Sequence, residues 1–386
     1  MAANGTLPDG DTAAADTVTS LAQAQTISPD EIALYDRQIR LWGMQAQQKI
    51  RTANILLISI RGLANEIAKN LVLAGIGSIT LVDHENVTEE DLGSQFLVSE
   101  ADVGQNRAET AAAQVRRLNS RVAVHTGTGD ISLMGPAFFE PFDVVIATND
   151  NFEILHHINT ATRVANRPFY VAGMHGFYGF IFADLIEHHY VIEREKPNKP
   201  TLVGPESATR SVESTSIKTD EGKVIEMVTK RELYSPLLLA NTSPLPLEIA
   251  SHRRRLRQVT PLLTAFRALW DFQKSTGRLP LGNPQDLRLF TQLATEKHKE
   301  LQLSGETLRS EFVRSFLQNL GSELAPVSAF LGGQLAQDVI NILGRREQPI
   351  QNFIFFDGEE SKSPMYALHP VFTDVDTTTI AVPSAL

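Results

Sequence analysis

Cysteine is absent from the 386 residues of the chain. The protein therefore has no disulfide, no thiolate zinc site and no cysteine nucleophile. Apolar runs are short, and none reaches the roughly 18 residues that a membrane-spanning helix requires. Basic charge is scarce as well, and the formal net charge of -10 argues against non-specific nucleic-acid binding, which depends on a basic surface. Residues 1–20 have neither the basic start nor the apolar stretch of a secretory signal, so we expect residues 1–27 to form a disordered tail.

The chain does contain a strand, a turn and a helix of the nucleotide-binding type. Residues 53–59 read ANILLIS, which is typical of a buried parallel strand, and residues 63–76 have the pattern of an amphipathic helix. A Rossmann-type site carries G-x-G-x-x-G at this junction, so that backbone N–H groups reach a phosphate. Here only Gly62 remains of the three glycines, and the side chain of Arg61 is expected to obstruct the phosphate. The pattern predicts a nucleotide-binding fold with a degenerate phosphate loop.

Strands and helices continue to alternate through the first half of the chain. The pattern predicts strands at residues 78–83, 122–126 and 142–148, helices at 107–119 and 152–166, and two strands joined by a turn within 169–185. Such alternation indicates an α/β fold with a doubly wound, mostly parallel, Rossmann-like sheet.

The alternation stops near residue 194. A charged, proline-containing linker follows at residues 195–199, and the segment 204–222, rich in Ser, Thr and Glu, is expected to be a mobile loop. Residues 233–320 have a mostly helical pattern. We therefore expect one α/β domain formed by residues 28–193 and 321–372, with residues 194–320 as an insertion (a mobile loop, then helices) and residues 373–386 as a C-terminal tail.

Several short motifs carry a resemblance to a known family. Residues 35–43 read YDRQIRLWG, and the motifs EIAKNL, LVD, GQNR and FIFFDG follow at residues 66–71, 81–83, 104–107 and 353–358. This set resembles the ThiF and ubiquitin-activating enzyme family. It is most similar to the small, non-cysteine subunits of heterodimeric SUMO-activating enzymes, across most of residues 30–195 and 315–370. The resemblance implies an adenylation-type domain, and YDRQIRLWG is its most specific part.

The resemblance also implies a partner and a reaction. In such a heterodimer ATP and Mg²⁺ are used to adenylate the C-terminus of SUMO, which then passes to a cysteine of the large subunit. The present chain has no cysteine and cannot form that thioester. Because its glycine loop is degenerate, it is also expected to be inactive alone. ATP and Mg²⁺ would be bound mainly by the partner, with none bound by this chain alone. The expected location is the nucleus and cytoplasm, without nucleic-acid or membrane partners.

Five residues match nucleotide-binding positions of the family, and we expect them to form a vestigial site without a metal: Gly62, Asp83, Arg107, Asp150 and Asn151. Asp83 follows Gly62 by about 20 residues, the spacing of an acid that holds a ribose hydroxyl, although a strand-end aspartate also caps turns. Arg107 stands where active members have a lysine, and Asp150-Asn151 matches a metal-coordinating pair. Active members carry Asn-Arg-Gln-Phe where residues 93–96 read GSQF, so the triphosphate-binding arginine is missing.

Arg37 and Arg40 are the candidate catalytic residues, with Arg37 the stronger of the two. They lie three residues apart, on one face of a predicted helix. The resemblance implies that the N-terminal arginine reaches the terminal phosphate in the partner's ATP site, a role that a permanently charged, forked guanidinium suits. The alternative is that both arginines form salt bridges with nearby acids.

Two further patterns leave alternatives open. Gly332 and Gly333, inside a predicted helix at residues 326–344, indicate a close crossing, either within the chain or across a dimer interface. The basic run at residues 253–257 fits a nuclear address or a solvated helix face.

Rival functions differ in what they require. The equivalent NEDD8-activating subunit begins similarly, but in the family it is longer and has a larger insertion. A NAD-linked Rossmann oxidoreductase requires an intact glycine loop. A homodimeric sulfur-carrier adenylyltransferase keeps the arginine and often a four-cysteine zinc site. A nucleotide-independent scaffold also remains compatible with the sequence.

Overall fold

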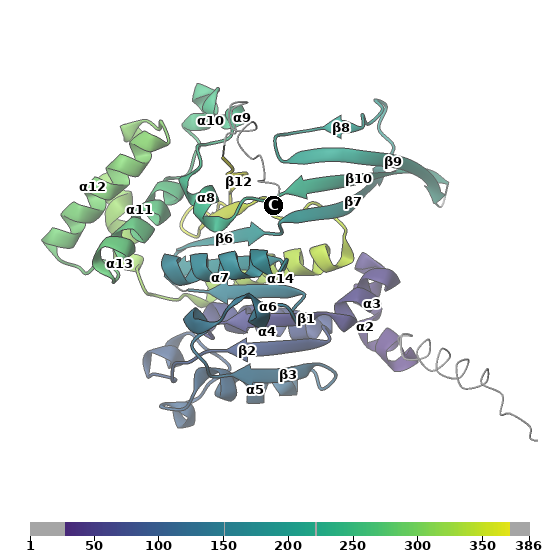
Figure 1. The fold of residues 1–386 in the computed structure, drawn as a ribbon, viewed down its shortest axis with the longest axis horizontal. Coiled ribbons are helices and arrows are strands. Elements are labelled where there is room, and N and C mark those ends of the chain that lie inside the picture. The colour runs from purple at the N-terminus through teal and green to yellow at the C-terminus, as the bar shows by residue number, and fades with distance from the viewer. Residues whose placement is uncertain (1–27, 150, 221, 371–386) are drawn as a thin grey trace, which may run out of the picture.

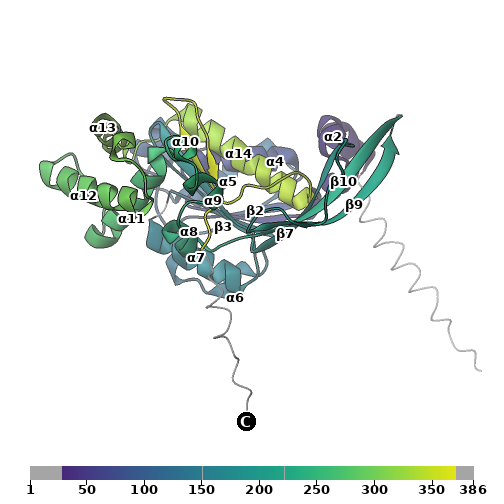
Figure 2. The same cartoon turned by 90° about the horizontal axis from the view of Figure 1, so that it is seen from above.

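The computed structural model describes residues 28–149, 151–220 and 222–370. It shows a central sheet between two layers of helices, with a second, smaller sheet and a group of helices at its periphery (Figures 1 and 2). The expected tails at 1–27 and 373–386 lie outside the described residues, as does Asp150. Within the described part of the chain, no helix is both long and apolar enough to cross a membrane.

The central sheet has eight strands in the order β12-β11-β6-β5-β4-β1-β2-β3. Its strands are β1 (Asn54–Ile58), β2 (Ser78–Val82), β3 (Ala123–Gly127), β4 (Val144–Thr148), β5 (Phe169–His175), β6 (Tyr178–Asp184), β11 (Phe353–Asp357) and β12 (Met365–Tyr366). Strands β5, β4, β1, β2 and β3, which are neighbours in that order, pair in parallel. Strands β6, β11 and β12 add antiparallel partners at the other edge. The predicted doubly wound, mostly parallel sheet is therefore confirmed.

Each face of this sheet is covered by its own helices, as the view in Figure 2 shows. One face carries α4 (Gly62–Ala74), α5 (Arg107–Leu118) and α14 (Ala325–Gly344), and the other carries α6 (Pro136–Phe139) and α7 (Phe152–Val164). Strands β1 and β4 are buried almost throughout, because their apolar side chains point to both faces of the sheet and helices cover each face. Two hydrophobic clusters result, one on each side of the sheet.

The N-terminal helices α2 (Pro29–Trp42) and α3 (Met44–Thr52) lead into β1. Ser28 caps α2 through a capping box with Glu31, and the helix is kinked at Tyr35, whose backbone angles are not helical. Gly43 follows with a φ of 86°, which separates α2 from α3.

The prediction of a mobile loop at residues 204–222 was wrong. A second sheet, of order β7-β10-β9-β8, contains most of this segment. Its strands are β7 (Glu187–Glu195), β8 (Gly204–Pro205), β9 (Arg210–Asp220) and β10 (Lys223–Leu233). Strand β7 continues across residue 194, so the expected start of the insertion falls inside a strand. The buried face of β10 carries charged residues in ion pairs, including Glu232 with Arg210 and Lys230 with Glu206, which conceal the apolar alternation of an ordinary strand.

Residues 233–320 are mainly helical, as predicted. The helices are α8 (Leu237–Thr242), α9 (Leu247–Ala250), α10 (Arg253–Leu256), α11 (Pro261–Thr276), α12 (Pro284–Glu300) and α13 (Ser310–Asn319), with a 3₁₀ turn at Gly305–Thr307. Further 3₁₀ turns lie earlier in the chain, at Glu90–Gly93, Glu100–Asp102 and Ile131–Leu133. Helix α11 packs on α7 and β11, which joins this group to the main sheet. The arginines of α10 are exposed, as a solvated helix face would be.

Helix α14 crosses α4 at Gly332. A Cβ on Gly332 would lie 2.6 Å from the Cβ of Glu66, whereas a Cβ on Gly333 would meet nothing within 4 Å. The close crossing at Gly332 is therefore internal to the chain.

Candidate functional site

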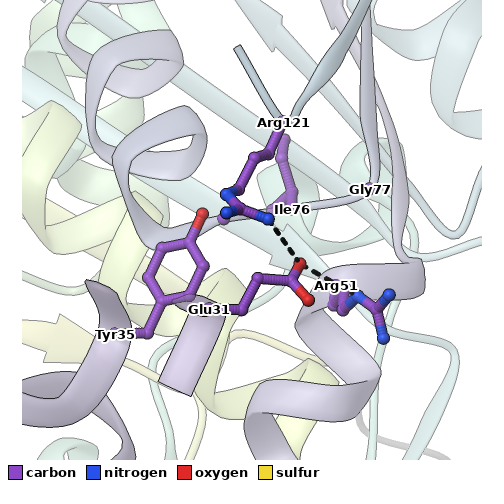
Figure 3. A pocket seen from close by; sticks show the side chains of 7 residues that line it. Glu31, Tyr35, Arg51, Ile76, Gly77 and Arg121 are labelled. Atoms are coloured by element: carbon purple, nitrogen blue, oxygen red, sulfur yellow. Dashed lines mark ion pairs between the residues drawn. The ribbon is translucent and has the colours of Figure 1, made fainter. Parts of the chain in front are cut away.

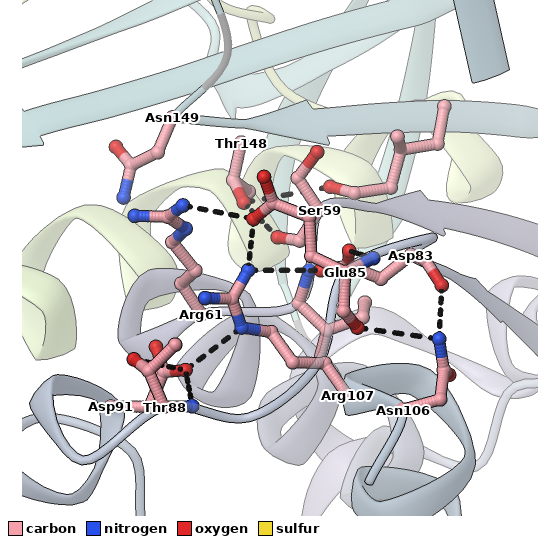
Figure 4. A network of polar contacts seen from close by, with 12 residues as sticks. Ser59, Arg61, Asp83, Glu85, Thr88, Asp91, Asn106, Arg107, Thr148 and Asn149 are labelled. Atoms are coloured by element: carbon pink, nitrogen blue, oxygen red, sulfur yellow. Dashed lines mark hydrogen bonds and ion pairs between the residues drawn. The ribbon is translucent and has the colours of Figure 1, made fainter. Parts of the chain in front are cut away.

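The degenerate phosphate loop lies where the strand order reverses. Strands β1 and β4 are neighbours, and the chain proceeds from them toward opposite edges of the sheet. Ligands of open α/β sheets bind at such a point, beyond the carboxyl ends of the strands. Ser59, Asp83 and Asn149 follow β1, β2 and β4 directly, so their side chains converge there (Figure 4).

A carboxylate of the chain itself fills the anion position of this loop. Glu323 Oε2 accepts hydrogen bonds from the backbone N–H of Gly62 at 3.0 Å and from Ser94 Oγ at 2.8 Å. Its Oε1 accepts a third from Asn149 Nδ2 at 2.6 Å. Gly62 is the first residue of α4, so the carboxylate faces the positive end of the helix dipole. A nucleotide phosphate placed at this helix N-terminus would meet the Glu323 carboxylate, and the residues do not fit that group.

The lack of a side chain at Gly62 is required by this arrangement. A Cβ on Gly62 would lie 2.9 Å from Glu323 Oε2 and 3.1 Å from the carbonyl oxygen of Ser94. The surviving glycine thus makes room for an internal carboxylate and the chain behind it.

Asp83 is also engaged by the chain. Its Oδ2 accepts a hydrogen bond from the Ile60 N–H at 2.7 Å, and its Oδ1 accepts one from the Glu85 N–H at 2.9 Å. Burial raises the pKa of Asp83, because desolvation outweighs these hydrogen bonds and the nearby Arg107. The ribose-type aspartate therefore holds the loop after β1 to the end of β2.

Arg107 forms the centre of a buried ionic cluster (Figure 4). Its Nε contacts Asp91 at 2.9 Å, its Nη1 pairs with Glu85, and Asp83 lies 4.0 Å from Nη1. Burial disfavours the charge of Arg107, but the surrounding carboxylates raise its pKa overall. Arg61 adds a second guanidinium, 3.2 Å from Glu85. Arg107 is thus occupied by acids of its own chain.

The expected site residues are only partly brought together. Gly62, Asp83 and Arg107 lie around one loop, as the family positions predict. Asn151 caps α7 by accepting a hydrogen bond from the Ile154 N–H at 3.0 Å, and Asp150 lies outside the described residues. Sequence reasoning missed Glu323, Glu85 and Asp91. No local motif could have revealed Glu323, which is 261 residues from Gly62 along the chain.

Arg37 and Arg40 have different surroundings on α2. Arg40 forms an exposed ion pair with Asp36, four residues earlier on the helix, at 3.0 Å. Arg37 is exposed, and it has no hydrogen bond or ion pair with any residue that the structure describes. The salt-bridge alternative therefore applies to Arg40, whereas Arg37 is exposed and has no polar partner in the part of the chain that the structure describes.

Across residues 28–149, 151–220 and 222–370, no group of three or more His, Asp and Glu side chains is arranged to hold a metal ion.

The fold and this loop define an α/β protein of the nucleotide-binding type whose phosphate position is filled from within. The chain belongs to the ThiF family, whose sequence model matches residues 35–373. Among its relatives, the DNA damage tolerance protein RHC31 of Saccharomyces cerevisiae is 38% identical over 348 residues, covering 89% of this chain and 99% of the relative. SUMO-activating enzyme subunit 1 of Rattus norvegicus is 35% identical, covering 89% of this chain and 96% of its own. The Homo sapiens protein of the same name is 34% identical, covering 89% and 97%.

Proposed function

We propose that the chain is the non-thioester subunit of a heterodimeric SUMO-activating enzyme. The names of the mammalian relatives support this assignment, and they match over nearly their full lengths. The absence of cysteine is compatible with this role, because the thioester would form on the larger, cysteine-bearing partner. The complex would adenylate the C-terminus of SUMO with ATP and transfer it to that cysteine, in the nucleus and cytoplasm.

One observation carries the division of labour between the subunits. Glu323 fills the anion position of the chain's own loop, whereas Arg37 is exposed and unpaired among the described residues. We therefore assign ATP and Mg²⁺ to the partner, and assign to this chain no cofactor of its own. ATP bound there would supply the leaving group for adenylation. Arg37 would approach its terminal phosphate across the interface, where a guanidinium can donate to two oxygens at once.

Reconstitution tests the proposal. The chain alone should show no SUMO-dependent exchange between ATP and pyrophosphate, and a one-to-one complex with the cysteine-bearing subunit should show it. Robust exchange by the chain alone would contradict the partner-held nucleotide. Exchange by the complex with NEDD8 but not with SUMO would transfer the assignment to that pathway, and a complex without exchange would leave only the scaffold role.

Solubility gives a second check. Obligate interfaces commonly bury ~2,000 Å² or more, so the isolated chain should be poorly soluble or self-associate. A monodisperse monomer that does not bind the partner subunit in light scattering would exclude an obligate heterodimer.

A further inference from the structure

Helix α2 carries Arg37 and is attached to the rest of the domain at several points. Near its C-terminus, Gln38 Nε2 donates a hydrogen bond to the Leu73 carbonyl at 3.2 Å, and Arg346 Nη1 donates one to the Trp42 carbonyl at 3.1 Å. Figure 2 shows α2 at one end of the molecule, away from the layers that cover the main sheet. Several of its apolar side chains point outward, and Leu34 and Leu41 are exposed. Glu31 and Tyr35 are instead buried, with 8% and 6% of their surfaces exposed. Glu31 and Tyr35 are thus the residues of α2 that are buried in the domain.

Glu31 joins three parts of the chain (Figure 3). Its Oε2 accepts a hydrogen bond from the Ser28 N–H at 3.1 Å, which closes the first turn of α2. Its Oε1 lies 3.2 Å from Arg51 Nε at the end of α3 and 3.7 Å from Arg121 Nη1 before β3. Burial opposes the charge of Glu31, but the Ser28 N–H and the two arginines lower its pKa overall. An ionised carboxylate thus connects α2 to both neighbours.

Tyr35 provides the second attachment, at the kink. Its hydroxyl oxygen accepts a hydrogen bond from Asn119 Nδ2 at 2.8 Å, and the same Nδ2 donates to the Val72 carbonyl at the end of α4. The ring lies against Gly75, where a Cβ would come within 2.5 Å of it, and Gly75 has a φ of 83°. The ring and the left-handed glycine therefore fit one another closely.

Arg37 follows Tyr35 by two residues, in the helical part that begins at the kink. Tyr35 fixes the start of that part, whereas Glu31 holds the first turn of α2, before the kink. Contacts of Gln38 and of the Trp42 carbonyl hold the part that follows. A cavity of about 280 Å³ separates α2 from the loop 75–77 between these contacts, and Arg51 and Arg121 line it (Figure 3). Because this gap leaves α2 without continuous packing at that place, loss of the Glu31 or the Tyr35 contacts should loosen the helix around Arg37.

We propose that Glu31 and Tyr35 are positioning residues for Arg37: they hold α2 in the orientation that presents Arg37 to the partner's nucleotide. This inference rests on the proposed function. Misplacement of a catalytic group by about 1 Å can cost ~10²-fold in rate, so a freed α2 should slow adenylation without any change at Arg37 itself.

The test is a double-mutant cycle in the full heterodimer, read by single-turnover adenylate formation. Glu31→Ala and Tyr35→Phe should each slow the step, by about 10- to 100-fold for Glu31→Ala. In an Arg37→Ala background the same changes should have almost no further effect, because the group that they position is gone. Hydrogen exchange of residues 29–42 should rise in Glu31→Ala. Glu31→Gln, which keeps the size of the side chain, replaces Glu31→Ala if the latter does not fold.

Asp286→Ala is the matched control. Asp286 is likewise a buried helical carboxylate paired with a partly exposed arginine, Arg278, at 2.6 Å. It should lower stability comparably and leave adenylation unchanged. Two outcomes would overturn the positioning role. One is that Glu31→Ala slows adenylation equally with and without Arg37. The other is that Glu31→Ala speeds hydrogen exchange of residues 29–42 but leaves the adenylation rate unchanged. Failure of the unmodified complex to form an adenylate would instead refute the proposed function.

Discussion

The carboxylate of Glu323 accepts a hydrogen bond from the backbone N–H of Gly62, the first residue of α4. The residue that a nucleotide loop would use to approach a phosphate is thus satisfied by the protein. Helix N-termini favour anions because their first N–H groups have no partner within the helix. An internal acid at this place therefore serves the fold in the way that a bound phosphate serves a nucleotide-binding protein.

Glu323→Ala should lower the free energy of unfolding by about 1–3 kcal/mol, because it leaves the Gly62 N–H, Ser94 and Asn149 without their shared acceptor. Chemical denaturation of the full chain measures this. Glu360→Ala is the control, since Glu360 forms only an exposed pair with Lys362 and should change stability by less than about 0.5 kcal/mol. Equal stability of the two variants would show that the internal carboxylate contributes nothing.

Gly332→Ala should destabilise the protein by about 1–3 kcal/mol, because its Cβ would press on Glu66 and the α4 backbone. Gly333→Ala should stabilise it by about 0.5–1 kcal/mol, since alanine is the better helix former and the space there is open. Thermal melting of the two variants compares adjacent positions of one helix. The reverse order would mean that α14 does not cross α4 at Gly332.

Arg37→Ala should leave the heterodimer assembled and slow adenylation by ~10²–10³, the loss seen when a donor to developing charge is removed. Arg37→Lys should restore only part of the rate, because a lysine cannot donate in a fork. Single-turnover adenylate formation measures both. Lys223→Ala, in an exposed pair with Glu195, is the control and should have no effect. Normal adenylation by Arg37→Ala would remove Arg37 from the mechanism.

Stability should fall as the pH is lowered through the range in which His175 titrates. Burial lowers the pKa of His175 to about 4, and its Nδ1 accepts a hydrogen bond from the Gly321 N–H. The unfolded chain, with a histidine pKa of about 6.5, binds the proton first, so the contribution is complete above that pH and is lost toward pH 4.

Between pH 7 and 5.5 this loss should amount to about 1 kcal/mol. His175→Gln, which can still accept from the Gly321 N–H, should show a correspondingly smaller drop. His188, whose pKa burial also lowers to about 4, should contribute to the drop in both proteins, which makes the comparison specific for His175. An identical pH dependence of the two would contradict a neutral, partly buried His175.

The sequence predicted the main sheet well because its strands are short apolar runs between helices with clear periodicity. Strand β1 and helix α4 are an example, and Asn106 and Asn151 cap α5 and α7 as their residue types favour. The hairpin of β9 and β10 was missed for a physical reason. Most side chains of β9 are exposed, and the inward positions of β10 hold charges neutralised by partners on β7, on β9 and in the loop after β8. Neither strand therefore shows the apolar alternation on which strand prediction depends.

The candidate site likewise contains some residues that the sequence identified and others that only the structure reveals. Family positions located Gly62, Asp83 and Arg107, and the sequence itself showed that the glycine loop is degenerate. The sequence did not reveal the groups that occupy the site, because Glu323 and Asp91 reach it only through the tertiary structure. A buried charge that lacks some of its partners is costly, so the acids around Arg107 stabilise it together. The contribution of each acid therefore becomes apparent only when all of them are placed in the structure.

The long span between Glu323 and Gly62 has a consequence for synthesis on the ribosome. Until residues 321–357 have left the exit tunnel, α4 lacks its acid, one face of the sheet lacks α14, and β6 lacks its neighbour β11. Contacts of such high sequence separation form late and slowly, and the surfaces awaiting them are prone to aggregate. We therefore expect the nascent N-terminal half to need protection from aggregation until residue 357 has emerged.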